Sequence, residues 1–263
     1  MTFPTTGLVT LLLALLAAAF LVGRAAGETV RQGALQVSFG GSVSPRVLPR
    51  TGTTPVSVEV RGRVRSLAGG PPPSLRRIAI EVNRIGVLDR RGLATCPLGR
   101  LRAASTADAL RACHGALVGE GRAAGVIVLP EQAPTPFAGR VVAFNGTLPD
   151  GQPAILAHLF SDVPAPLTFV LAFSLGRAHG AFGTRLVATV PRRTRRTAHV
   201  TSFALRLGRV FTVGGERRAY LSAGCPAPEG FPGVTFPLVR ASYGFVDHEA
   251  VSDTLVRTCR VRR

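Results

Sequence analysis

The clearest structural signal in this sequence is the ten-residue segment Val56-Ser-Val-Glu-Val-Arg-Gly-Arg-Val-Arg65. Valine recurs at alternate positions through most of it, and Ser, Glu or Arg stands between the valines. Successive side chains of a β-strand point to opposite faces, so this period of two predicts a strand with one buried and one solvated face. The buried face is expected to carry Val56, Val58, Val60 and Val64.

The same alternation recurs along the chain, most clearly at 35–39, 78–83 and 203–207. Turn sequences such as Val213-Gly-Gly-Glu216 and Pro149-Asp-Gly151 separate apolar runs. Short connections of this kind favour antiparallel pairing over βαβ units. The predicted fold class is therefore all-β, an antiparallel β-sandwich-like domain with one short inserted helix. Further strands are expected at 124–129, 140–148, 154–160, 168–175, 184–190, 209–213, 216–222, 236–246 and 253–261.

The inserted helix is expected at about 105–114. Ser105 is a favoured N-cap residue, Asp108 lies in the first turn, and Gly115 stands where the helix should end. A helix this short is not stable alone. A disulfide from Cys113 back to Cys96 would hold it against the sheet.

Four cysteines follow the N-terminal segment, and an even number in an exported chain predicts disulfides. Three pairings are possible, and we favour the two local ones, Cys96–Cys113 and Cys225–Cys259. A zinc site is disfavoured because the sequence has no Cys-x-x-Cys spacing and no paired histidine nearby. No metal or other cofactor is expected.

The N-terminus predicts export. Residues 8–23 form an uncharged apolar stretch, and Arg24 and then small residues follow it. This length fits a signal-peptide core better than a membrane span, which needs about 20 residues. We expect a signal peptide at 1–27, with an uncleaved N-terminal anchor as the alternative, and a single β-rich extracellular domain at 28–263. The expected location is secreted or in the cell envelope, outside the cytoplasm.

The charge is strongly positive. The chain has 32 basic and 14 acidic residues, a formal net charge of +18, and every basic residue is Arg. A GC-rich genome accounts for Arg in place of Lys, but not for the shortage of acids. Such a chain is attracted to anionic surfaces, so the expected partners are anionic cell-envelope polymers or lipid head groups. Export argues against nucleic acid as the physiological partner.

The densest positive charge is the segment 191–197, which we expect in a loop between strands. Its four guanidinium groups can bind phosphates or carboxylates through paired hydrogen bonds. They form the candidate anion-binding site, with a solvated basic loop as the alternative. The four residues are Arg192, Arg193, Arg195 and Arg196.

Signals for catalysis are weak. The sequence has no Gly-x-Ser-x-Gly nucleophile elbow and no Lys for a phosphate-binding loop. No acidic cluster points to the carboxylate pair of a glycosidase. The five histidines lack metal-binding spacing, and His158, inside an apolar run, is interpreted as a core residue. No catalytic residue can be named, and an enzyme is not expected.

Two stretches resemble an uncharacterised family of exported β-rich proteins from high-GC actinobacteria. They are LQVSFGGSVSPRVLPR at 35–50 and LSAGCPAPEGFPGVTFPL at 221–238. The resemblance runs from about residue 33 to the C-terminus. It implies export and lineage, and it brings no activity or catalytic residues with it.

Three functions follow as hypotheses. The leading one is a secreted or envelope-associated protein without catalytic activity that acts in structure or binding. The second is an extracellular hydrolase whose active site is assembled from distant residues. The third is a carrier of an apolar ligand, which an enclosed cavity would favour. That hypothesis starts from one strand face, expected to carry Phe169, Leu171, Phe173 and Leu175.

Overall fold

The fold is known from a computed structural model that describes residues 28–102, 105–248 and 250–262. The predicted signal peptide or anchor at 1–27 lies outside the described residues. Among the residues described, no helix is both long and apolar enough to span a membrane.

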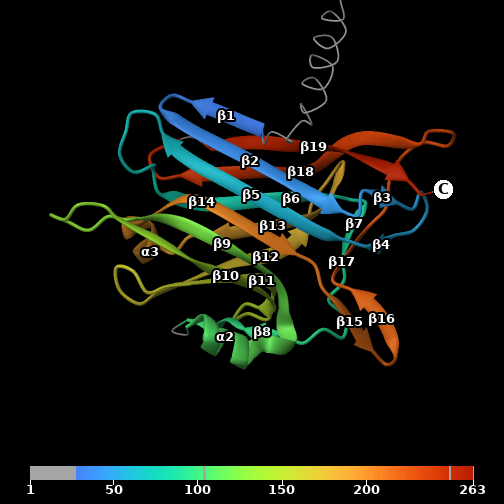
Figure 1. The fold of residues 1–263 in the computed structure, drawn as a ribbon, viewed down its shortest axis with the longest axis horizontal. Helices are drawn as coiled ribbons and strands as arrows, with labels where there is room; N and C mark the ends of the chain where they lie inside the picture. The colour runs from blue at the N-terminus through green and yellow to red at the C-terminus, as the bar shows by residue number, and fades with distance from the viewer. Residues whose placement is uncertain (1–27, 103–104, 249, 263) are drawn as a thin grey trace, which may run out of the picture.

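The molecule is built on one 14-stranded sheet, which confirms the all-β prediction (Figure 1). All its pairings are antiparallel except β10 with β8 (Cys96–Pro97) and β19 with β3. In spatial order the remaining strands are β1 (Glu28–Gln32), β2 (Leu35–Ser44), β5 (Ser57–Ser66), β14 (Ala198–Leu207), β9 (Leu117–Ile127), β10 (Thr135–Thr147), β11 (Pro153–Ser161), β12 (Leu167–Arg177), β13 (Phe182–Thr189), β6 (Leu75–Asn83), β18 (Gly233–Phe245), β19 (Val251–Val261) and β3 (Val47–Leu48).

Two small sheets complete the strands. One joins β4 (Thr54–Pro55), β17 (Leu221–Ala223) and β7 (Gly86–Leu88). The other is the hairpin of β15 (Val210–Val213) and β16 (Glu216–Ala219), whose turn was predicted from Gly214 and Gly215. Both glycines have positive φ, 58° and 82°, which a two-residue turn of this kind requires. The sequence did not signal β1 or the short strands β3, β4, β7 and β8.

The large sheet curls so that its two ends face each other. Buried residues of β2 and β5 form one core with those of β6, β18 and β19. Phe39 of β2 meets Tyr243 of β18 edge to face, with ring centroids 6.2 Å apart. The two layers of the expected sandwich are therefore parts of one continuous sheet.

Strands β1 and β2 contact β19 where the curled sheet meets itself, and side-chain hydrogen bonds join them there. The Val256 amide donates to Glu28 Oε1 at 3.2 Å, and Arg257 Nε donates to the Gly41 carbonyl at 2.9 Å. In the order of paired strands β1 and β3 are the two edges of the sheet, and no ladder pairs β1 or β2 with β19. We call this contact between β1–β2 and β19 the seam.

The predicted helix is present as α2 (Thr106–Cys113). The Ser105 hydroxyl accepts from the Asp108 amide at 3.2 Å, and the Asp108 carboxylate accepts from the Ser105 amide at 3.3 Å, which is a capping box. A 3₁₀ turn, η1 (Leu98–Leu101), precedes it, and another, η2 (His114–Ala116), follows it. Val142, Phe144 and Leu156 of β10 and β11 pack in one cluster with residues of this segment.

The arginine-rich segment differs from expectation. It forms the short helix α3 (Arg192–Thr197) between β13 and β14, where a loop was predicted. Arg195 N donates to the Pro191 carbonyl at 3.0 Å, which closes its first turn. Arg has good intrinsic helix propensity, so a run of arginines is compatible with one turn of helix.

Candidate apolar binding cavity

The curl of the sheet leaves an internal cavity of about 390 Å³. Its walls carry the inward-facing residues of strands that lie far apart in the sequence, and most of them are aliphatic. Val58 and Val60 of β5 face Ile80 of β6 and Leu238 of β18 across it. The alternating pattern of β5 therefore supplies the cavity as well as the core.

The cavity lies beside β3 and the small sheet of β4, β17 and β7, because residues of β3, β7 and β17 line it. Figure 1 shows these strands at one end of the large sheet. Val87 of β7 and Val256 of β19 line it and are 45% and 41% exposed. Pro45 and Arg46, in the β2–β3 connection, are also exposed lining residues. These exposed residues mark the side on which the cavity opens to solvent.

Asn83 is a buried polar residue of the lining, and its amide is used by the fold. Its Nδ2 donates to the Pro237 carbonyl at 2.7 Å, and its Oδ1 accepts from the Ile85 amide at 3.1 Å. A buried amide with both ends bonded keeps a wall in place without needing a ligand.

Arg257 brings a charge to the wall of the cavity. Beyond its bond to Gly41, its Nη1 donates to the Val256 carbonyl at 2.6 Å and lies 3.7 Å from Glu28 Oε1. Its Nη2 is buried and has no hydrogen-bond partner among the described residues. The guanidinium thus joins the seam to the cavity and keeps one terminal nitrogen unused.

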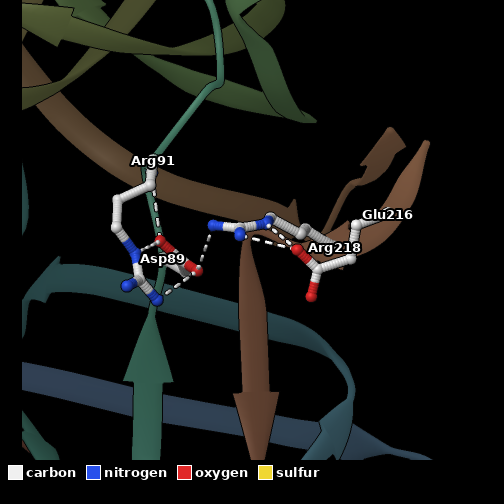
Figure 2. Close-up of polar contacts among 4 residues, drawn as sticks. All are labelled: Asp89, Arg91, Glu216 and Arg218. Carbon is white, nitrogen blue, oxygen red and sulfur yellow. Dashed lines mark hydrogen bonds and ion pairs between the residues drawn. The ribbon is translucent and has the colours of Figure 1, made fainter. Parts of the chain in front are cut away.

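Figure 2 shows a polar cluster at Asp89, which directly follows β7, a strand whose Val87 and Leu88 line the cavity. Both oxygens of Asp89 accept from Arg91, each at 3.0 Å, and Arg218 Nη1 lies 3.9 Å from Asp89 Oδ2. Arg218 also donates to Glu216 on the β15–β16 hairpin, at 2.7 Å. The hydrogen bonds from Arg91 and the nearby charge of Arg218 lower the pKa of Asp89. This carboxylate stays ionised and ties the hairpin to β7.

A second concave region lies on the outer side of the sheet, over β5, β14, β9 and β10. Its hollow has a volume of about 1160 Å³. We call it the outer arginine face, and it is defined by Arg61, Arg63, Arg122, Arg140 and Arg206, together with Glu59 and Glu120.

The charges of the outer arginine face are only partly balanced. Arg140 donates to Glu120 at 2.6 Å, and Arg206 donates to the Ser57 hydroxyl at 3.1 Å. Arg122 lies directly opposite Arg140 in the ladder between β9 and β10. Like charges in opposed positions of a sheet are destabilising, so an anion bound here would relieve the repulsion.

The four cysteines form two disulfides, Cys96–Cys113 and Cys225–Cys259. These are the local pairings favoured from the sequence. The first fastens α2 to β8, and the second joins the segment after β17 to β19. Cys259 also lines the cavity, so this bridge braces one of its walls.

The four arginines predicted as an anion site lie on α3. Of these, Arg195 is half-buried and the other three are exposed. Among the described residues, no carboxylate lies within ion-pair distance of any of them. Arg195 and Arg196 are three and four positions after Arg192, so these three arginines share one face of the helix, and their role in anion binding stays a prediction. The four are Arg192, Arg193, Arg195 and Arg196.

The described lining of the cavity contains neither histidine nor carboxylate. His158 is fully buried, as its apolar setting predicted. Burial raises the pKa of Tyr220 and of Tyr243, so both phenols stay neutral. The described residues contain no group of three or more His, Cys, Asp or Glu side chains placed to hold a metal ion.

The apolar strand face noted in the sequence is divided between several clusters. Leu171 and Phe173 pack against the main core, and Phe173 lines the cavity. Leu175 packs near Tyr220. Phe169 meets Phe137, with ring centroids 5.7 Å apart.

The cavity itself was not visible in the sequence. Its walls come from strands that were expected, but an inward valine beside a void follows the same pattern as an inward valine in a packed core. Comparisons with protein-family models, curated proteins and solved structures find no match for this chain.

Proposed function

We propose that this protein binds and carries an apolar ligand in the interior of its curled sheet. The observation that supports this is the cavity of about 390 Å³ with a mostly aliphatic lining. This volume lies within the range of small-molecule sites, roughly 300–1,000 Å³. Such sites are mostly apolar, with a few polar groups that orient the ligand.

The energy of an empty cavity favours a guest. Aliphatic side chains around an unfilled space lack the dispersion contacts that a packed core would give them. Water entering from the open side would have to wet aliphatic side chains, which is unfavourable. An apolar molecule relieves both penalties.

The proposed setting is extracytoplasmic, either secreted or in the cell envelope. Two disulfides and no free cysteine among the described residues are typical of an oxidising compartment. The signal-like sequence at 1–27 supports the same location. A carrier there would move a water-insoluble molecule through an aqueous space.

The experiment is displacement of N-phenyl-1-naphthylamine, a neutral dye that fluoresces in apolar sites. We expect the wild-type protein to bind the dye and release it to dodecanol. Ala157→Phe places a ring in the cavity, which Ala157 lines, and should abolish binding. Ala204→Phe adds the same ring on the exposed outer side of β14 and should leave binding unchanged.

Two results would contradict the proposal. One is a wild-type protein that shows no saturable dye binding. The other is equal binding by Ala157→Phe and Ala204→Phe when circular dichroism shows that both are folded, because the dye would then lie elsewhere.

A second candidate function is binding of anionic envelope polymers through the outer arginine face. The opposed pair Arg122 and Arg140 supports it, since these two residues are ladder partners on β9 and β10 and the described carboxylate contact, that of Glu120, is made by Arg140. Polyanion binding of this kind weakens as salt screens the exposed charges.

Its test compares variants that remove the same charge from different places. Arg122→Gln should weaken retention on purified anionic cell-wall polymer and reduce its dependence on salt. Arg100→Gln, in η1 and away from this face, should not. Equal losses in both variants would show that only the net charge matters.

A further inference from the structure

We infer that the ligand of the cavity is an anionic amphiphile, with its tail in the cavity and its acidic head on Arg257. This inference rests on the proposed function and specifies its ligand. The geometry behind it is an arginine, Arg257, that lines an apolar cavity and whose guanidinium keeps one buried nitrogen without a described hydrogen-bond partner.

The strand places Arg257 on the inner side of the sheet. Leu255 and Cys259, two positions before and after it on β19, are buried. Side chains two apart in a strand share a face, so Arg257 points inward with them. Its ladder partner on β18 is Phe236, which also lines the cavity.

This guanidinium makes three described polar contacts, two of them across the seam to Gly41 and Glu28. Nε binds the Gly41 carbonyl, and Nη1 binds the Val256 carbonyl and approaches Glu28. Nη2 remains, and it is buried with no described hydrogen-bond partner. Buried donors are nearly always bonded in native proteins, so an unbonded one calls for an acceptor that the chain does not provide.

The charge balance of the cavity indicates an anionic acceptor. The described lining includes two arginines, Arg257 and Arg46, and no carboxylate. Arg46 is exposed on the open side, and no described carboxylate lies within ion-pair distance of it. A carboxylate or phosphate beside Arg257 would be attracted by its guanidinium charge, and a rotation of this side chain would let the buried Nη2 donate to it while the aliphatic tail contacts the valines and leucines.

Glu28 is the natural competitor for this position. Its Oε1 accepts from the Val256 amide and lies 3.7 Å from Nη1 of Arg257. A bound anion would share the guanidinium with this carboxylate and be repelled by it. Neutralising Glu28 should therefore strengthen binding of an acid, an effect that a purely structural role for the seam does not predict.

The experiment compares laurate with dodecanol by titration calorimetry, below the concentration at which either aggregates. A hydrogen bond to a charged group is worth about a tenfold change in affinity or more, so the wild type should bind laurate at least about tenfold more tightly. Arg257→Gln should remove this preference, so that laurate binds no more tightly than dodecanol. Glu28→Gln keeps the acceptor for Val256 and should strengthen laurate binding alone.

The outcomes separate the two proposals. Equal affinity for laurate and dodecanol in the wild type would overturn the head-group inference and leave the apolar carrier standing. Binding of neither would contradict the carrier itself. If Arg257→Gln fails to fold, Glu28→Gln and Arg46→Gln decide, because the first should raise and the second should lower the preference for laurate. No change in either variant would refute the role of Arg257.

To distinguish the source of the acid, lysophosphatidic acid is titrated in parallel. Tighter binding than laurate would indicate a phosphate head, and weaker binding would indicate a free carboxylate. Both outcomes agree with an anionic amphiphile. If dodecanol binds and neither acid does, an anionic amphiphile is excluded as the ligand.

Discussion

Glycine allows neighbouring strands of this sheet to approach where a larger residue would collide. A Cβ on Gly121 of β9 would lie 2.0 Å from the Ala204 carbonyl oxygen and 2.8 Å from Leu205 Cα on β14. Both neighbours are backbone atoms, which cannot move aside as a side chain can. The absence of a side chain at Gly121 is therefore what allows β9 and β14 to pair at this distance.

Gly121→Ala is therefore expected to lower the free energy of unfolding by about 1–3 kcal/mol, the usual penalty for overpacking. Gly99, with nothing within 4 Å of an added Cβ, provides the control, and Gly99→Ala should be neutral or slightly stabilising. Urea denaturation measures both. Equal stability of the two variants would mean that β9 and β14 adjust freely.

Asp89 makes a residue-scale prediction about pH. Its pKa is lowered in the folded protein by the hydrogen bonds from Arg91, with a contribution from Arg218, so the folded state favours the ionised carboxylate. The resulting stabilisation is complete above the unfolded pKa, near 4, and is lost as pH falls through the lowered folded value. Asp89→Asn should flatten the loss of stability in this acid range. A thermal melt series from neutral to acid pH tests this, and parallel curves for the two proteins would refute it.

At the scale of elements, α2 combines a local signal with a long-range restraint. The capping box of Ser105 and Asp108 sets where the helix begins. The disulfide between Cys113 and Cys96 then holds eight helical residues that would not be stable alone. The sequence predicted this element well because the capping residues Ser105 and Asp108 and the cysteine that anchors the helix, Cys113, all lie within or next to it.

Ser105→Ala should lower stability by about 1 kcal/mol, because the amide of Asp108 loses its acceptor. Ser105→Thr keeps a hydroxyl that both accepts from the Asp108 amide and donates to its carboxylate, so it should recover most of the loss. Denaturant unfolding of the three proteins gives the comparison. A loss of similar size in Ser105→Thr would show that the cap is not the cause.

The two disulfides are expected to differ in their effects. Cys96–Cys113 joins residues 17 apart, and its removal should lower the free energy of unfolding by about 3 kcal/mol in the chain-entropy model. Cys225–Cys259 joins residues 34 apart, and its removal should lower it by about 4 kcal/mol. Only Cys259 lines the cavity. The double variant Cys225→Ala/Cys259→Ala should therefore weaken dodecanol binding, whereas Cys96→Ala/Cys113→Ala should lose stability with binding intact. If dodecanol binding were instead weakened in Cys96→Ala/Cys113→Ala and intact in Cys225→Ala/Cys259→Ala, the position of the cavity would be contradicted.

At the scale of the whole molecule, ligand binding and stability should be linked. A ligand that binds only the folded state at a hundred times its Kd adds about 2.7 kcal/mol, or roughly 5–10 °C for a domain of this size. Dodecanol should raise the melting temperature of the wild type by this amount. Ala157→Phe fills the same space, so its melting temperature should not respond. A shift in both proteins would point to binding outside the cavity.

The apolar cavity and the arginine-rich regions of the molecule lie in different places. The cavity opens at the end of the sheet near β3, β4 and β7, and α3 lies at the opposite end (Figure 1). The outer arginine face belongs to the outer side of the sheet, whereas the cavity belongs to its inner side. An anionic surface bound to the outer arginine face would therefore not occupy the cavity.

Strand positions, the hairpin at Gly214 and Gly215, and the capped helix at Ser105 could be read from the chain, because each depends on residues adjacent in sequence. The cavity and the guanidinium of Arg257 on its wall could not. Val58, Ile80 and Leu238 come together only after pairing over long separations has curled the sheet. Whether inward side chains then meet in a packed core or leave a void depends on that curvature, which the alternating pattern of any single strand does not contain.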